Sequence, residues 1–202
     1  IVRHVAHHYG KDRTFSAPIL AMCALAGRLG SGRDAWRDVP QLPFELAVLP
    51  QRCFRMLRLH VVSYALPALI AVGLVRHRLL PARCFVRRRL RDAATPRVLV
   101  VLQRLQPPNG GFLEAPPLTA FVLMSLCACR LHDHRVAQRC ARFLCATARQ
   151  DGSWPIDTNL ATWVTTLAIN GLAEASSHNP LASVERASLL TLLLEQQHVT
   201  RH

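Results

Sequence analysis

Lysine is almost absent from this 202-residue chain: Lys11 is the only lysine among 25 basic residues, so arginine carries nearly all of the positive charge. The 12 acidic residues leave a formal net charge of +13. Such a balance predicts a polyanionic partner, either nucleic acid or an anionic membrane surface. It is equally typical of a genome that encodes arginine wherever a surface cation is needed, and the charge alone does not choose between these interpretations.

Long apolar runs are also missing. No stretch reaches the roughly 20 uncharged apolar residues that a membrane-spanning helix needs. The longest candidate, 61–75, contains Pro67, and we expect it to be a buried or interfacial helix. We expect no signal peptide at the start of this sequence, and we expect the sequence to be a piece of a longer protein.

Paired cysteines of the C-x-x-C type are absent as well. The seven cysteines are odd in number and lie mostly in apolar stretches, which favours small core residues in a reducing compartment. A zinc site would have to use the unusual set Cys127, Cys129, His132 and His134. We therefore expect no metal and no cofactor.

What the sequence does contain is a series of apolar segments bounded by prolines, which are typical of helix starts and stops. We expect helices over 15–29, 42–49, 51–59, 119–129 and 161–172. The dense arginine run over 83–91 is predicted to be a surface linker. The fold class is therefore predicted to be all-α.

An internal repeat is the strongest signal. Asn109, Gly110 and Phe112 correspond to Asp151, Gly152 and Trp154 at an offset of 42 residues. An Asn-Gly or Asp-Gly pair makes a tight turn that accepts a positive φ, and a glutamine at the preceding helix end, such as Gln106, can bond exposed backbone groups there. A third repeat begins at 193–197. A period in the forties with two helices per unit predicts stacked helical hairpins.

This pattern resembles the Q-W repeat of squalene-hopene cyclases and other prenyltransferase-like α/α barrels. The matching structural-repeat residues are Gln106, Gly110, Phe112, Gly152, Trp154 and Gln197. Two positions depart from the pattern, since Ala148 replaces a glutamine and Phe112 a tryptophan. The segments 9–27, 39–46 and 62–69 are also similar in order and spacing to upstream parts of that family.

The resemblance implies an α/α toroid, present here as a single partial barrel domain over 1–202. Helices and a membrane- or channel-like segment would occupy 1–92, and Q-W-type repeats 93–202. Enzymes of the family are class II terpene cyclases, isomerases of triterpenoid biosynthesis, in which an Asp-x-Asp-Asp motif protonates squalene. None of the seven aspartates here is adjacent to another. The resemblance therefore implies no catalytic residue in this segment, which would be inactive alone.

The resemblance also implies eight residues of the substrate cavity or channel: Phe15, Ile19, Ala24, Ala115, Pro116, Pro117, Ile156 and Asp157. At two of them isoleucine replaces an aromatic residue, which weakens the case for hopene-type control of the cation. Simpler roles are core packing for Phe15 and an N-cap for Asp157. Glu114 is expected to be a solvated loop carboxylate or a lone acid.

The leading hypothesis is a fragment of a squalene-hopene-cyclase-like terpene cyclase that acts on squalene or a related isoprenoid. It would lie peripherally on the cytoplasmic face of a membrane, which it would contact through 51–80, and its catalytic half would be missing. The alternative is a non-catalytic α-toroid module that binds a lipid or a partner protein. No nucleic acid is expected, because the arginines are scattered. A prenyltransferase β-subunit would need a zinc site that the sequence does not offer.

Overall fold

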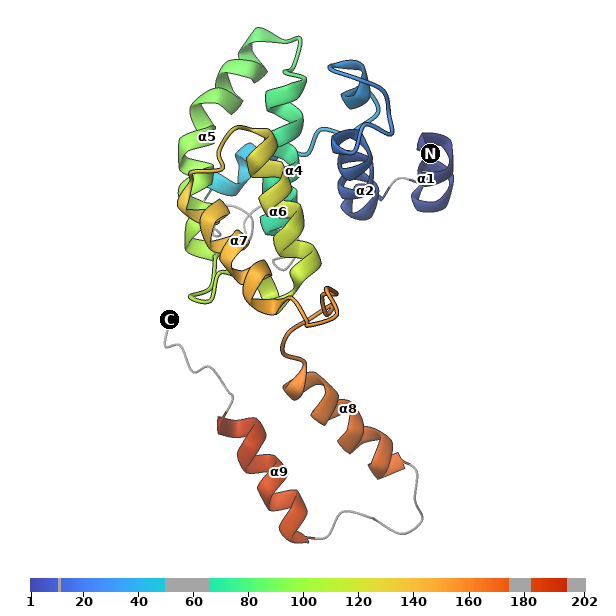
Figure 1. Ribbon diagram of the computed structural model, residues 1–202, viewed down its shortest axis with the longest axis vertical. Helices are drawn as coiled ribbons and strands as arrows, with labels where there is room; N and C mark the ends of the chain where they lie inside the picture. Colours follow the sequence, from blue (N-terminus) through green and yellow to red (C-terminus); the bar gives the residue numbers. More distant parts are fainter. Residues whose placement is uncertain (11, 50–65, 175–182, 196–202) are drawn as a thin grey trace. The chain divides into compact units, whose positions relative to one another are not determined.

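The computed structural model describes residues 1–10, 12–49, 66–174 and 183–195. Within these ranges the chain forms eight α-helices, three short 3-10 helices and no β-strand (Figure 1). The predicted all-α fold class is therefore confirmed for this part of the chain.

The structure divides into two compact units, Ile1–Thr158 (unit 1) and Asn159–His202 (unit 2), and each is described by itself. Unit 1 contains α1 (Val2–Tyr9), α2 (Arg13–Leu25), η1 (Asp34–Trp36), η2 (Phe44–Val48), α4 (Leu66–Leu79), α5 (Phe85–Leu105), η4 (Phe112–Glu114), α6 (Pro116–Ala128) and α7 (Arg135–Thr147). Unit 2 contains α8 (Ala161–Glu174) and α9 (Ser183–Glu195). The predicted division between residues 92 and 93 falls inside α5, and the single partial barrel domain stays a prediction.

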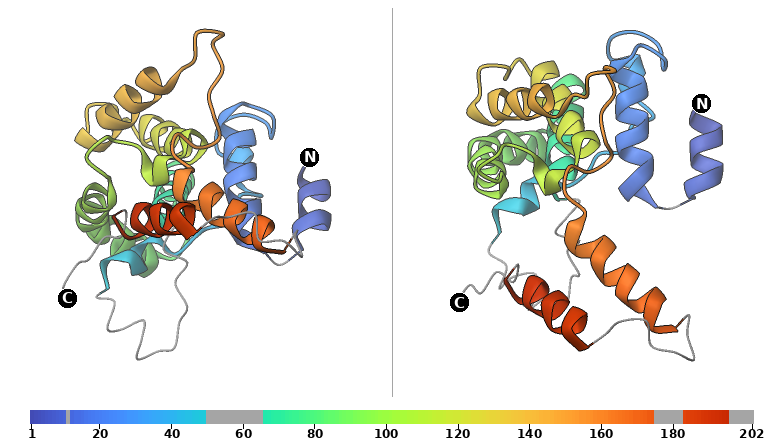
Figure 2. Two further views of the ribbon diagram at one scale, coloured as in Figure 1. Left: turned by 90° about the horizontal axis from the view of Figure 1, so that it is seen from below. Right: turned by 60° about the horizontal axis from the view of Figure 1, so that its bottom comes forward.

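Helix α4 is central to unit 1. Residues 70–75 are buried in succession, around the whole circumference of the helix. A helix that is apolar all round must be covered on every side, and α4 packs against α2, α5, α6 and η2 (Figures 1 and 2). Gly73 lets η2 approach closely, because a Cβ there would lie 2.9 Å from both the Leu42 carbonyl oxygen and the Phe44 Cβ.

Among the described residues of unit 1, two apolar clusters form the core. The larger joins η2, α4, α5, α6 and α7, and its buried side chains include Phe44, Ile70, Leu74, Leu102, Phe112 and Leu126. The smaller joins α2, η1 and α4 and includes Leu20, Trp36, Val39 and Val75. Because burying one such side chain contributes about 1.5–3 kcal/mol, these clusters account for most of the attraction between the helices.

Helix α5 corrects one expectation. The predicted surface linker over 83–91 is wrong, since residues 85–91 form the first turns of this 21-residue helix. Thr95, Val98 and Leu102 are buried at helical spacing, and this face packs against η2 and α4. The arginine run has no apolar periodicity of its own, so the helix could not be inferred from it. The buried residues of α5 lie further along the chain, from Thr95 onward.

Two polar pairs join α5 to its neighbours. His77 Nε2 on α4 lies 2.9 Å from Asp92 Oδ1, and Arg91 Nε donates to Glu45 Oε1 of η2 at 3.0 Å. The His77 side chain is only 2% exposed, and its Nδ1 atom has no hydrogen-bond partner among the described residues. The hydrogen bond from His77 is the main cause of the lowered pKa of Asp92. These pairs fix how α5 is rotated against α4 and η2, because a buried polar group must keep its partner.

The other predicted helices are present with shifted ends. The helix expected over 15–29 is Arg13–Leu25, and the one expected over 42–49 is the 3-10 helix Phe44–Val48. The helix expected over 51–59 lies outside the described residues. No described helix combines the length and the apolar character needed to cross a bilayer.

Candidate functional site

The first glycine turn connects α5 to α6. The Gly110 N–H donates to the Pro107 carbonyl at 3.0 Å, and Gly111 N–H donates to Asn109 Oδ1 at 3.1 Å. Gly110 has φ +94°, a left-handed conformation that favours glycine. Buried Gln106 closes the turn, because its Nε2 donates to the Gly110 carbonyl at 2.9 Å and is 3.2 Å from that of Val136.

Helix α7 packs directly on these two glycines. A Cβ on Gly110 would lie 2.5 Å from the Arg139 carbonyl oxygen, and a Cβ on Gly111 would lie 2.3 Å from the Phe143 ring. The Arg139 guanidinium also donates to the carbonyls of Pro107 and Pro108, both at 2.8 Å. The missing side chains thus make room for the next helix of the repeat.

The second glycine turn repeats the local geometry 42 residues later. Gly152 N–H donates to the Arg149 carbonyl at 3.0 Å, Ser153 N–H donates to Asp151 Oδ1 at 2.9 Å, and Gly152 has φ +81°. The bond from Ser153 lowers the pKa of Asp151. The surroundings differ, because a Cβ on Gly152 would meet nothing within 4 Å. The two turns therefore share the same hydrogen bonds, but only the first glycine turn is packed against a neighbouring helix.

The aromatic residues that follow the two turns have different environments. Phe112 is 1% exposed in the main core, and its N–H donates to Thr119 Oγ1 at 2.9 Å. Trp154 is 52% exposed, and its indole Nε1 donates to the Leu144 carbonyl on α7 at 2.7 Å. That bond fixes the edge of the indole ring and leaves much of the remaining ring accessible.

Trp154 is part of an apolar groove in unit 1. The groove has a volume of about 300 Å³ and is lined by Pro116, Pro117, Ala120, Leu144, Trp154, Pro155 and Ile156. Three of the predicted cavity residues, Pro116, Pro117 and Ile156, thus come together although Ile156 is far from the two prolines in sequence. Ala115 immediately precedes α6 as its N-cap, and Asp157 follows the groove residue Ile156 and is half-buried.

Glu114 connects the segment before α6 to the segment that follows the second turn. Thr158 N–H donates to the Glu114 carbonyl at 2.8 Å, Thr158 Oγ1 donates to Glu114 Oε2 at 2.6 Å, and Asn109 Nδ2 donates to Glu114 Oε1. Leu113 and Glu114 have φ of +54° and +57°, a conformation that costs of order 1–3 kcal/mol for a residue with a side chain. The Glu114 carboxylate is therefore a tether between the two repeats and not a free acid.

The remaining predicted cavity residues lie on α2 and do not line the groove. Phe15 is 54% exposed and stacks on Tyr9 with ring centroids 6.1 Å apart, so the simpler expectation that it belongs to the core is wrong. Ile19 is half-buried, and Ala24 is buried in the smaller core cluster. The repeat residue Gln197 lies outside the described residues.

The N-cap role considered for Asp157 belongs to another residue. In unit 2, the Ala161 N–H at the start of α8 donates to Asn159 Oδ1 at 3.1 Å. Asn and Asp cap helices in the same way. The observed cap, Asn159, therefore lies two residues after the predicted one, Asp157.

Two residues of the conceivable zinc site, Cys129 and His134, are at least partly buried within unit 1. His134 Nδ1 accepts from the Val136 N–H at 3.3 Å and caps α7, and burial lowers the pKa of His134. Burial raises the pKa of Cys129 to about 12, so this thiol is protonated at neutral pH. Across the described ranges, no group of three or more His, Cys, Asp or Glu side chains could hold a metal ion.

No family model matches the sequence, and no curated protein and no solved structure is significantly similar to it. The resemblance to squalene-hopene cyclases accordingly stays a prediction.

Sequence reasoning missed three features of this site. Ala120 could have been inferred, because it lies one helical turn after Pro116 on the same face. The side of the groove formed by Leu144 and the bond between Glu114 and Thr158 had no sequence signal, since both join segments that are distant in the chain.

Proposed function

We propose that this chain is part of a squalene-hopene-cyclase-like α/α toroid, and that the apolar groove contacts a squalene-like isoprenoid. The observation that carries the proposal is the recurrence of one turn, with the same backbone bond and the same side-chain bond, 42 residues apart. Each turn lies between two helices. Helical hairpins that repeat in this way are the building blocks of stacked α/α architectures.

The chemistry of the groove supports an isoprenoid as the ligand. Its lining residues are all apolar, and Trp154 offers an accessible π face, which suits both a hydrocarbon chain and a carbocation. Ligand sites usually measure roughly 300–1,000 Å³, and this groove of about 300 Å³ is at the lower end of that range. We therefore expect it to hold one part of a long isoprenoid, with the rest of the chain contacting other residues.

Catalysis would require an acid from elsewhere in a longer protein. Protonating an alkene needs a strong and correctly placed acid, whereas both Glu114 oxygens accept hydrogen bonds from neutral donors. In the proposal, the segment binds the substrate at the cytoplasmic surface of a membrane, and an Asp-x-Asp-Asp motif in the missing half supplies the proton.

Binding is tested with a photoreactive squalene analogue, followed by peptide mapping of the cross-links. Ala120→Trp fills the groove, whereas Met124→Trp places the same ring one turn later on α6, outside it. We expect Ala120→Trp to weaken binding by about tenfold or more, because an occupied pocket cannot bury the ligand, and Met124→Trp to change it less than about twofold. Equal affinities for the two variants, or cross-links confined to other segments, would exclude the groove.

The second candidate is a non-catalytic α-toroid module that binds a lipid. Two observations favour it: the Glu114 carboxylate serves as a tether, and isoleucine stands at positions 19 and 156, where the resemblance implies aromatic residues. The longest natural protein that contains this chain should be incubated with squalene and the extract examined by mass spectrometry. Cyclised products favour the cyclase, and binding without products favours the module.

A further inference from the structure

The side of α5 that faces away from the core carries apolar and basic residues together. Phe85, Val86, Leu90 and Val100 are 67%, 72%, 59% and 48% exposed, and Arg89 and Arg97 are exposed between them. These six residues recur at helical spacing on the side opposite the buried Thr95, Val98 and Leu102. We call them the basic apolar face.

This face carries an excess of positive charge. Within the described ranges, no carboxylate forms an ion pair with Arg89 or Arg97. The one acidic residue of α5, Asp92, lines the same surface pocket as Phe85 and Arg89, and its carboxylate bonds to His77. The Arg89 guanidinium carbon lies 5.0 Å from the centre of the Phe85 ring, so the cation and the aromatic ring are held together. The face therefore attracts anions while presenting apolar surface to them.

This combination fits a lipid surface better than it fits nucleic acid. Arginine can bury its aliphatic part beside apolar neighbours and extend its guanidinium to a phosphate. Helices with basic and apolar residues lie in the interface of anionic bilayers in this way. A nucleic acid would pair with the arginines but leave Phe85, Val86 and Leu90 in water.

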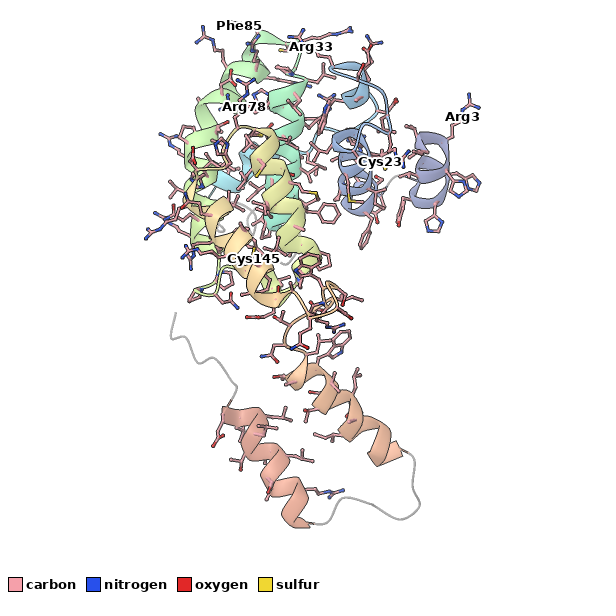
Figure 3. The ribbon with its side chains drawn as sticks, viewed as in Figure 1. Arg3, Cys23, Arg33, Arg78, Phe85 and Cys145 are labelled. Carbon is pink, nitrogen blue, oxygen red and sulfur yellow. The ribbon has the colours of Figure 1, made fainter. Side chains whose placement is uncertain are left out.

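The length of the helix also fits a contact along a surface. At 1.5 Å per residue, the 21 residues of α5 span about 30 Å. Figure 3 places Phe85 at the far end of the helical bundle from Cys145, so the basic apolar face begins at one end of the bundle.

We propose that the basic apolar face docks α5 against a bilayer that contains anionic phospholipids. This contact is separate from the segment 51–80, in which the sequence placed the membrane contact, and it does not depend on isoprenoid binding or on cyclisation. It would hold unit 1 through one outer helix and leave the groove at α6 and α7 available.

The experiment is flotation of the 202-residue chain with vesicles of phosphatidylcholine, or of equimolar phosphatidylcholine and phosphatidylglycerol. The charge variant is Arg89→Gln with Arg97→Gln, and its matched control is Arg135→Gln with Arg142→Gln on the exposed side of α7. Each arginine near an anionic surface contributes about fivefold to partitioning. We expect the charge variant to lose about 25-fold in binding to the anionic vesicles, and the control to lose less than about threefold.

The apolar contribution is tested separately with Phe85→Gln and Leu90→Gln, against Met22→Gln and Met124→Gln as exposed controls of the same kind. We expect the first pair to reduce vesicle binding by about tenfold or more, and the control pair to leave it nearly unchanged. Circular dichroism confirms that each variant is folded.

Several results would overturn the proposal. Equal binding of the chain to neutral and anionic vesicles would show that charge does not drive the contact. Equal losses of vesicle binding for the α5 and α7 arginine pairs would show that the basic apolar face is not the contact surface. If the arginine pair on α5 weakens binding to RNA and vesicles alike while the apolar pair has no effect, the surface binds polyanions in general and does not insert into a bilayer. Because no isoprenoid is present, these outcomes test the membrane contact of α5 alone, and isoprenoid binding at the groove is tested by its own experiment.

Discussion

Replacing Gly110 by alanine tests whether α7 packs on the first glycine turn, and the second turn provides the control. Both Gly110 and Gly152 have a positive φ, +94° and +81°, so the added methyl group strains the backbone at either position. Only at Gly110 does the new Cβ meet a neighbour, the Arg139 carbonyl oxygen at 2.5 Å. The difference between the two variants therefore isolates the contact with α7.

The magnitudes follow from these two terms. A left-handed conformation costs about 1–2 kcal/mol for an L-residue, and this is the whole effect expected for Gly152→Ala. A methyl group forced against packed backbone costs about 1–3 kcal/mol more. Gly110→Ala should therefore lower the free energy of unfolding by about 2–5 kcal/mol.

The assay is urea unfolding followed by far-UV circular dichroism, with the m-value checked in each variant so that changes in midpoint report stability. If the two variants are destabilised equally, to within about 0.5 kcal/mol, α7 does not press on the first turn and the packing argument is wrong. A larger loss for Gly152→Ala than for Gly110→Ala would refute it outright.

Three further predictions concern single side chains. Gln106→Leu should cost about 1–3 kcal/mol in unfolding free energy, because buried backbone carbonyls lose their donor; no loss in urea unfolding would mean that the amide is dispensable. The pKa of Asp92 is lowered in the folded state, so its contribution to the free energy of unfolding is present above the unfolded pKa of about 3.9 and is lost as pH falls through the lower folded value. Asp92→Asn should therefore reduce the loss of stability at acidic pH, by under about 1 kcal/mol because the group is half-exposed. An unchanged pH dependence of stability in acid would contradict the bond to His77. Backbone N–H groups at the start of α5 lower the pKa of the exposed Cys84 thiol. Iodoacetamide should therefore alkylate Cys84 faster than the exposed Cys145 near neutral pH, as followed by peptide mass spectrometry. Equal rates would show that Cys84 does not have the larger thiolate fraction.

The glycine turns show what local sequence could predict. Asn109 and Asp151 each accept a bond from the N–H two residues later, and Gly110 and Gly152 both adopt a positive φ. These features depend only on residues adjacent in the chain, so the 42-residue offset was sufficient to infer them. The environment of the following aromatic residue was not inferred, because what covers Phe112 and leaves Trp154 exposed is contributed by other helices.

The site was predicted in part for the same reason. Pro116, Pro117 and Ile156 were assigned to a cavity through the family resemblance, and all three line one groove. The residues of α2 that were assigned with them lie elsewhere, because a resemblance in residue order does not fix which surfaces meet. The tether from Glu114 to Thr158 was beyond prediction, since hydrogen bonds between distant segments have no periodicity.

The sequence by itself determined the all-α class, several of the helices, the two turns and the excess of arginine, since helix periodicity, turn chemistry and charge are properties of neighbouring residues. Only the tertiary structure decided that the arginine run belongs to a helix, that its outer side joins apolar and basic residues, and that the walls of the groove come from α6, α7 and the second turn. The physical reason is that burial and pairing depend on which segments meet in space, and that choice is made by the packing of the whole unit around α4.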